Sequence, residues 1–190
     1  MTLEELYQSH CRSGHASSAH LPRLRALAEG LELAVEFGVK QGATSCAMLL
    51  GAQRVIGIDI RETPQARALE QLAGARWEYR IADSRRTQVP PCDLLFFDSH
   101  HSYKQLRDEL EAHAHKVRRY MVFHDTITFG SIAANGETGK HAWRYETGRS
   151  VPLEHLGIRP AIDHYMAQDD SWRVRSHYVD SHGLLILERR

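Results

Sequence analysis

The chain has 190 residues, of which 42% are hydrophobic, 25% charged and 8% aromatic. These proportions are ordinary for a globular protein and exclude a disordered, collagen-like or coiled-coil chain. The 24 Lys and Arg residues balance the 24 Asp and Glu residues. The net field therefore offers no general attraction to polyanions, which disfavours nucleic acid as the main substrate.

The three cysteines, Cys11, Cys46 and Cys92, have no CxxC spacing. Neither a disulfide framework nor a thiolate zinc site is predicted from them. The chain begins without a cationic segment followed by an apolar run, and no apolar stretch approaches the ~20 residues that span a bilayer. We therefore expect a cytoplasmic protein with no membrane partner.

Residues 1–30 are predicted to form an N-terminal helical segment, in which Leu21, Leu24 and Ala28 follow a helical period. After it, short apolar runs alternate with helical patterns, which is typical of a parallel sheet covered by helices. Strands are predicted at 33–37, 54–60, 76–81, 93–98 and 120–124, and helices at 43–50, 64–73 and 103–118.

The helix predicted at 103–118 has an apolar stripe through Leu106 and Leu110, and we interpret His113 and His115 as exposed histidines on it. Residues 127–157 are rich in glycine and have weak periodicity, which predicts a lid or substrate loop.

A helical pattern starts at Pro160. It is followed by strand-like runs at 172–179 and 183–188, with a turn between them. A hairpin there would make the last strand antiparallel to the others. The expected fold class is therefore α/β, with a mostly parallel central sheet, an antiparallel last strand and helices on both faces.

Ligands of open α/β sheets bind outside the carboxyl ends of the strands, so polar residues there are candidates for a site. The first such loop, from Glu36 to Ser45, has the form ExGxxxG and brings backbone close to a ligand, although a plain strand-to-helix turn would also need its glycines. It lacks the GxGxxG pattern of dinucleotide binders, which disfavours NAD and FAD. The later strand ends carry Asp59, Asp83 with Ser84, Asp98 with His100 and His101, and His124 with Asp125.

Over about residues 31–126 this set resembles the class I methyltransferases that use S-adenosylmethionine. The resemblance implies a Rossmann-like methyltransferase domain at 31–190. In it, Asp59 would hold the ribose, and Asp83 and Ser84 would lie by the adenine, although either could be an ordinary turn residue or cap. Glu36, Gly38 and Gly42 would line the methionine side, and Ser45 and Asp98 are further cofactor-binding candidates. Lys40 stands where the common GxGxG loop has its second glycine.

The stretch from Phe97 to Tyr103 and the later His124-Asp125-Thr126 resemble the metal-dependent O-methyltransferases of the Methyltransf_24 and macrocin O-methyltransferase type. That resemblance implies Asp98, His124 and Asp125 as metal ligands. It implies His100 and His124 as catalytic candidates, with His100 as the base. His101, Tyr103 and His124 stay open as alternatives for the base. A homodimer has the resemblance as its only support.

Deprotonating an ordinary alcohol, which is about as acidic as water, takes roughly 12 kcal/mol at pH 7. A divalent cation stabilises the alkoxide while a neutral histidine removes the proton. Carboxylate oxygens favour Mg²⁺, and histidine ligands would also admit Mn²⁺, Fe²⁺ or Zn²⁺.

The sequence therefore predicts metal-assisted methylation of a small-molecule hydroxyl, such as that of a sugar on a natural product or glycan. Three alternatives stay open. They are metal-independent N- or C-methylation, a non-catalytic module that binds S-adenosylmethionine or a metabolite, and nucleic-acid methylation through a local patch at Arg85 and Arg86.

Overall fold

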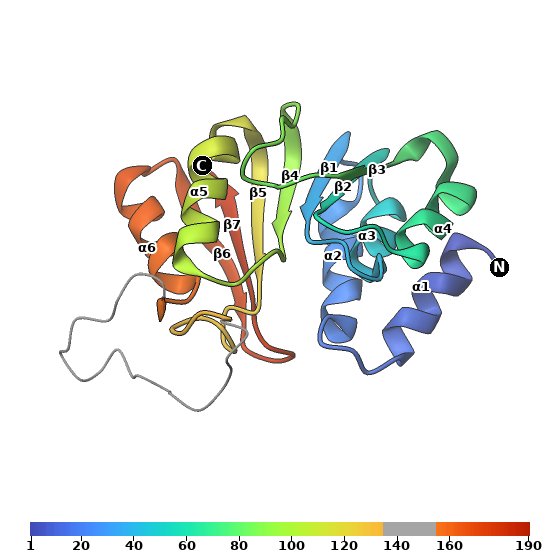
Figure 1. Ribbon diagram of the computed structural model, residues 1–190, viewed down its shortest axis with the longest axis horizontal. Helices are drawn as coiled ribbons and strands as arrows, with labels where there is room; N and C mark the ends of the chain where they lie inside the picture. Colours follow the sequence, from blue (N-terminus) through green and yellow to red (C-terminus); the bar gives the residue numbers. More distant parts are fainter. Residues whose placement is uncertain (135–154) are drawn as a thin grey trace.

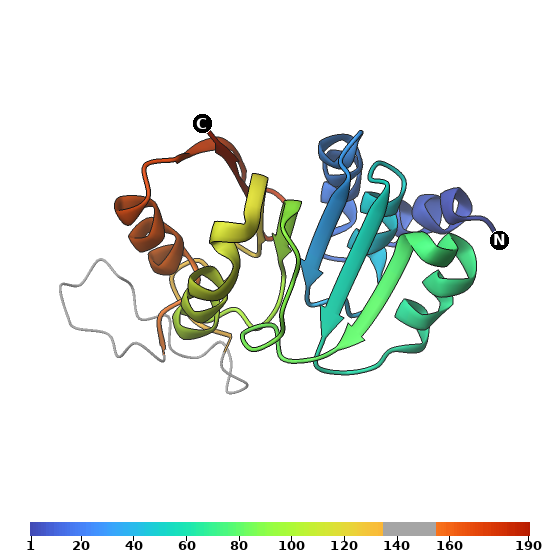
Figure 2. The ribbon, with the colours of Figure 1, turned by 90° about the horizontal axis from the view of Figure 1, so that it is seen from above.

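The computed structural model describes residues 1–134 and 155–190. Within these ranges, seven strands form one sheet in the order β3-β2-β1-β4-β5-β7-β6 (Figures 1 and 2). The strands are β1 (Leu33–Phe37), β2 (Arg54–Asp59), β3 (Trp77–Ile81), β4 (Cys92–Phe97), β5 (Val117–His124), β6 (Trp172–Tyr178) and β7 (Leu184–Arg189).

The first five strands run parallel, and β7 is antiparallel to both of its neighbours, β5 and β6. The predicted reversal of the last strand is therefore confirmed. The chain moves outward from β1 through β2 to β3 and then crosses back to β4 on the other side of β1. That switch point is where open α/β sheets bind their ligands.

The helices lie on both faces of the sheet, as predicted. The first four pack into one hydrophobic cluster and the last two into the other. They are α1 (Leu3–Arg12), α2 (Leu21–Ala28), α3 (Ala43–Leu49), α4 (Pro64–Ala73), α5 (Tyr103–His113) and α6 (Arg159–Gln168).

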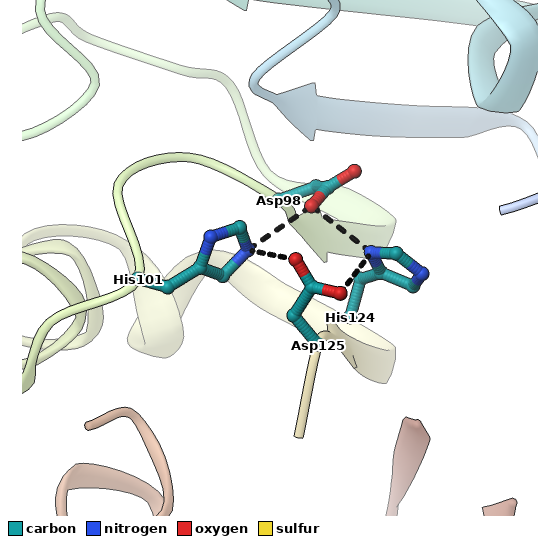
Figure 3. A group of neighbouring side chains, drawn as sticks. All are labelled: Asp98, His101, His124 and Asp125. Carbon is teal, nitrogen blue, oxygen red and sulfur yellow. Dashed lines mark hydrogen bonds and ion pairs between the residues drawn. The ribbon is translucent and has the colours of Figure 1, made fainter. Parts of the chain in front are cut away.

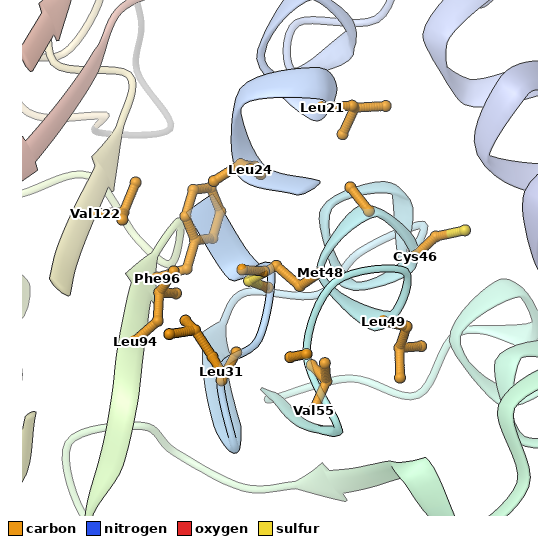
Figure 4. Packing of buried hydrophobic residues seen from close by; sticks show 14 of the residues in the cluster. Leu21, Leu24, Leu31, Cys46, Met48, Leu49, Val55, Leu94, Phe96 and Val122 are labelled. Carbon is orange, nitrogen blue, oxygen red and sulfur yellow. The ribbon is translucent and has the colours of Figure 1, made fainter. Parts of the chain in front are cut away.

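Alternation along the central strands divides the core into these two clusters. Leu94 and Phe96 of β4 face the α2 and α3 side, together with Val122 of β5 (Figure 4). Leu95 and Phe97, between them in sequence, face α5 and α6. Successive side chains of a strand point to opposite faces, and burial on both faces accounts for the continuous apolar runs seen in the sequence.

One predicted boundary is wrong. The helix expected at 103–118 ends at His113, a 3₁₀ turn covers Ala114–Lys116, and β5 begins at Val117 rather than at residue 120. Val117 pairs with Cys92 of β4. Ala114 and Val117 are both buried against the same cluster as Leu110, so their apolar spacing continued the helical pattern beyond the end of the helix.

The N-terminal segment packs on the same core as the sheet. Tyr7 of α1 and Leu21 and Leu24 of α2 are buried against α3. Most of the lid or substrate loop predicted at 127–157, namely residues 135–154, lies outside the residues that the structure describes. Among the helices that the structure describes, none is long and apolar enough to cross a membrane.

Candidate functional site

A cleft of about 820 Å³ opens at the carboxyl ends of the parallel strands. Most of the residues singled out from the sequence line it, namely Gly38, Asp59, Asp83, Ser84, Asp98, His100, His124 and Asp125. Glu36, Gly42 and Ser45 do not. The volume falls in the range of ~300–1,000 Å³ common for small-molecule sites.

The loop after β1 lies directly against the end of β4. Gly38 has a φ of +87°, and a Cβ there would lie 2.1 Å from the carbonyl oxygen of Asp98. Only glycine therefore lets the two strand ends approach so closely. Lys40, at the missing second glycine, also adopts a left-handed conformation with φ 50°.

Asp59 holds this loop in place. One oxygen, Oδ2, accepts the backbone N–H groups of Val39 and Lys40 at 2.9 and 3.0 Å, and Oδ1 accepts that of Arg61 at 3.1 Å. The side chain also lines the cleft. The carboxylate predicted to hold a ribose thus also orders the backbone beside the cleft.

Glu36 lies beneath the cleft rather than in its wall. It is fully buried, and its two oxygens accept the hydroxyl groups of Thr44 and Ser45. Burial raises the pKa of Glu36 to about 8. Glu36 and Ser45 hydrogen-bond to each other where β1 meets α3 and do not line the cleft, and their contacts with a cofactor stay predictions. Thr44, which the sequence analysis did not single out, does line the cleft.

Gly42 has a structural role at the start of α3. It is the N-cap residue with φ 73°, and a Cβ there would lie 2.8 Å from Leu69 Cδ1 of α4. The left-handed φ favours glycine at this turn, and a Cβ there would require the Leu69 side chain to shift.

On the far side of the cleft, Asp83 pairs with Arg85 at 2.8 Å, which holds the pKa of this carboxyl below its usual range. The hydroxyl of Ser84 donates to Glu109 of α5, a residue that the sequence analysis missed. Glu109 is 1% exposed, and the same carboxylate oxygen also accepts Ser99 Oγ at 2.6 Å and Gln105 Nε2 at 2.8 Å. This buried acid ties two walls of the cleft together.

His113 is buried, at 1% exposure, with Nε2 2.6 Å from the Ser84 carbonyl oxygen. Its interpretation as an exposed histidine is wrong, whereas His115 is exposed as expected. Glu109 and His113 both fall on the apolar stripe of α5, four positions apart. Two polar residues on the buried face of a helix indicate a buried hydrogen-bond network, and this pattern could have been found in the sequence.

At the centre of the cleft, Asp98 and Asp125 meet two histidines (Figure 3). His101 Nε2 lies 3.1 Å from Asp98 Oδ1 and 3.3 Å from Asp125 Oδ2. His124 Nδ1 lies 3.1 Å from Asp98 Oδ1 and 3.4 Å from Asp125 Oδ1. One ligand atom from each of these four residues lies within 4.8 Å of all the others. We call this set the four-residue cluster.

The cluster joins the three metal ligands predicted from the sequence with His101, which had been considered only as an alternative base. Burial alone would raise the pKa of Asp98, but hydrogen bonds from His101 and His124 hold it below its usual value. Burial likewise raises the pKa of Asp125. His100 lies outside the cluster but lines the cleft, and partial burial lowers its pKa.

The N-terminal segment also reaches the cleft. His15, Ala16 and Ser17, between α1 and α2, line it. No sequence pattern indicates that these three residues lie at the site.

The fold, the glycine loop and the acidic strand ends are those expected of a class I S-adenosylmethionine-dependent methyltransferase. Residues 35–126 match the family model Methyltransf_24, described as a methyltransferase domain. A comparison with curated protein sequences gave no match.

Three solved structures illustrate the likeness in fold. An O-methyltransferase from Bacillus cereus in complex with S-adenosylhomocysteine has a TM-score of 0.68 and 17% identity, covering 99% of this chain and 90% of its own. The N-methyltransferase NodS from Bradyrhizobium japonicum has a TM-score of 0.55 and 13% identity, and the match covers 90% of this chain and 92% of NodS. The N-terminal domain of EvdMO1, studied in the presence of S-adenosylhomocysteine and D-fucose, has a TM-score of 0.53 and 17% identity. The match covers 90% of this chain and 82% of the EvdMO1 domain.

Proposed function

We propose that this methyltransferase transfers the methyl group of S-adenosylmethionine to a hydroxyl oxygen of a small molecule, assisted by a divalent cation. The observation that carries the proposal is the position of the four-residue cluster in the same cleft as the glycine loop and Asp59. One cleft therefore holds residues suited to the cofactor and residues suited to activating an acceptor.

The donor set of the cluster fits a cation. Two carboxylates and two imidazoles are ligand types that divalent metal ions take in proteins. In the part of the chain that the structure describes, neither Asp98 nor Asp125 pairs with a Lys or Arg side chain, and only the two histidines contact both carboxylates. A bound divalent ion would lower the free energy needed to deprotonate an acceptor hydroxyl.

The protein's own groups would then orient the reactants and accept the proton. His100 lines the cleft beside the cluster, and its lowered pKa favours the neutral imidazole that a base requires. Asp59 orders the backbone of the glycine loop on the cofactor side. We propose His100 as the base and Asp59 as a cofactor-binding residue.

The likeness to an O-methyltransferase supports oxygen as the acceptor atom, and the likeness to the D-fucose-associated EvdMO1 domain supports a sugar as the acceptor class. The likeness to NodS favours the second candidate, N-methylation. Assays on hydroxyl and amine acceptors, with and without a chelator, distinguish the two, because N-methylation by histidine bases would not depend on metal. The homodimer and the cytoplasmic location stay predictions.

The proposed binding of S-adenosylmethionine through Asp59 is tested by calorimetry. S-adenosylmethionine and S-adenosylhomocysteine are titrated into the wild-type protein and into the Asp59→Ala variant. We expect wild-type binding and at least a tenfold weaker affinity in the variant, since a hydrogen bond to a charged group contributes ~1.5–3 kcal/mol. Glu62→Ala is the matched control, because Glu62 is a nearby exposed carboxylate that does not line the cleft. Equal affinity in wild type and Asp59→Ala would overturn the ribose assignment.

A further inference from the structure

We infer that the four-residue cluster is a mixed nitrogen and oxygen site that selects a transition-metal ion such as Zn²⁺, Co²⁺ or Fe²⁺ over Mg²⁺, with His101 as its fourth ligand. The inference rests on the proposed function only in that a divalent ion occupies this cleft. It departs from the sequence-based prediction, in which Mg²⁺ was the favoured metal and His101 was not a ligand.

The cluster offers both carboxylate oxygens and imidazole nitrogens as ligand atoms. Mg²⁺ prefers a shell of oxygen ligands and keeps several water molecules, whereas imidazole nitrogen suits zinc, iron and nickel ions. Half of the side chains in the cluster are imidazoles (Figure 3). Each has one ring nitrogen facing the carboxylates, Nε2 in His101 and Nδ1 in His124.

The distances between the ligand atoms of the cluster also bear on which ion it binds. Four nitrogen-to-oxygen distances in the cluster lie between 3.1 and 3.4 Å. Ligands bound to zinc at ~2.0–2.1 Å in a tetrahedron are separated by about 3.3 Å, whereas adjacent ligands of an octahedral Mg²⁺ are about 2.9 Å apart. These distances are close to the tetrahedral value, and a bound ion would draw in the wider separations of the cluster, which reach up to 4.8 Å.

Neighbouring side chains pack against the rings of both histidines in the cluster, His101 and His124. The His101 ring stacks on Phe129, with centroids 5.1 Å apart. His124 is 2% exposed and meets the edge of His20, whose Nε2 donates to the Ser181 carbonyl at 3.1 Å. Asp125 has a left-handed φ of 58°. Packing thus restricts both rings to the orientation in which one nitrogen of each faces the carboxylates.

The inference is tested on full-length protein freed of metal by chelation. Titration with CoCl₂ should give the intense visible absorption of tetrahedral Co²⁺, and ZnCl₂ should abolish it by competition. Calorimetry should give an affinity for ZnCl₂ at least a hundredfold above that for MgCl₂. These readouts require neither substrate nor turnover.

His101→Ala and the larger His101→Gln should each weaken Zn²⁺ binding at least tenfold and diminish the tetrahedral Co²⁺ spectrum. Two variants are used so that a folding defect in one, seen by circular dichroism, leaves the other informative. His100→Ala is the matched control, since His100 adjoins His101 and lines the same cleft but lies outside the cluster. Its Zn²⁺ affinity should equal that of the wild type.

Tighter binding of Mg²⁺ than Zn²⁺, or unchanged Zn²⁺ affinity in both folded His101 variants, would overturn the inference. A Mg²⁺-loaded protein that binds S-adenosylmethionine and methylates a hydroxyl would then leave the proposed function standing. Conversely, Zn²⁺ binding that depends on His101, without binding of S-adenosylmethionine, would support the metal site and overturn the proposed function.

Discussion

Glu36 has a buried carboxyl group at the base of the cleft, and burial raises its pKa from 4.5 to about 8. Below pH 4.5 the group is protonated in both the folded and the unfolded chain. Between pH 4.5 and 8 the unfolded chain releases this proton while the folded chain keeps it, so the free energy of unfolding decreases as the pH rises. The contribution is roughly 1.4 kcal/mol for each pH unit in that window.

Glu36→Gln should remove this contribution, because the amide stays uncharged and keeps the shape of the side chain. Urea denaturation of both proteins at pH 5 and pH 7.5 measures it. We expect the stability of the wild type relative to the variant to fall as the pH rises. The same pH dependence in both proteins would show that Glu36 does not stay protonated in the fold.

Single residues also show where sequence reasoning stops. Asp98 and Asp125 could be predicted as a pair because each follows a strand, and parallel strands end at one edge of a sheet. Of the adjacent histidines, His101 enters the cluster and His100 does not. That difference depends on the direction of the chain after β4, which no sequence period specifies.

At the scale of elements, the contact between the β1–α3 loop and β4 depends on Gly38. Alanine there would combine a left-handed backbone conformation with a Cβ 2.1 Å from a backbone oxygen that cannot move aside freely. We expect Gly38→Ala to lower the free energy of unfolding by at least ~2 kcal/mol more than Gly30→Ala. Gly30 also has a positive φ, of +74°, but a Cβ there meets nothing within 4 Å.

Urea denaturation of the two glycine variants measures this difference. Because both substitutions place alanine in a left-handed conformation, their difference isolates the clash with Asp98. Similar losses of stability would mean that the loop after β1 relaxes away from β4. Gly38→Ala should also weaken binding of S-adenosylhomocysteine, which calorimetry can follow in the same preparations.

The end of α5 shows why element boundaries are harder to predict than elements. Ala114 and Val117 are buried in the same cluster as Leu110, so the apolar spacing alone extends the helix to residue 118. The chain instead leaves the helix at His113, and Val117 pairs with Cys92. Hydrogen bonding to a strand distant in sequence decided the boundary.

In the whole molecule, the N-terminal segment joins the core, the cleft and the C-terminal hairpin. Leu21 and Leu24 are fully buried beside α3. Arg23 donates to Asp180 at 3.0 Å and lies over the Tyr178 ring at 4.0 Å. Residues 15–17 line the cleft. The segment is therefore integrated with residues 31–190 in packing.

Removal of residues 1–30 should abolish cooperative unfolding, because it exposes the apolar surface of α3 and one face of the sheet. Urea denaturation followed by circular dichroism, with binding of a hydrophobic dye, measures this. Glu5→Ala is the control, since it removes the Glu5 half of the α1 capping box and an exposed ion pair with the N-terminus, and should cost at most about 1 kcal/mol. Cooperative unfolding of the truncated chain near the wild-type midpoint would instead identify residues 31–190 as an independent domain.

The alternation of strands and helices, the reversed last strand and the acids at the strand ends could all be predicted from the amino-acid sequence. These features are local, since hydrophobic period, glycine position and strand-end polarity are all set within a few residues. The three-dimensional fold, in contrast, buries Glu36 beneath the cleft, lets Glu109 join its walls and brings His101 into the four-residue cluster with His124. A polar group removed from water must find its partner wherever the fold places one, and the hydrophobic period of the sequence does not specify which side chain that is.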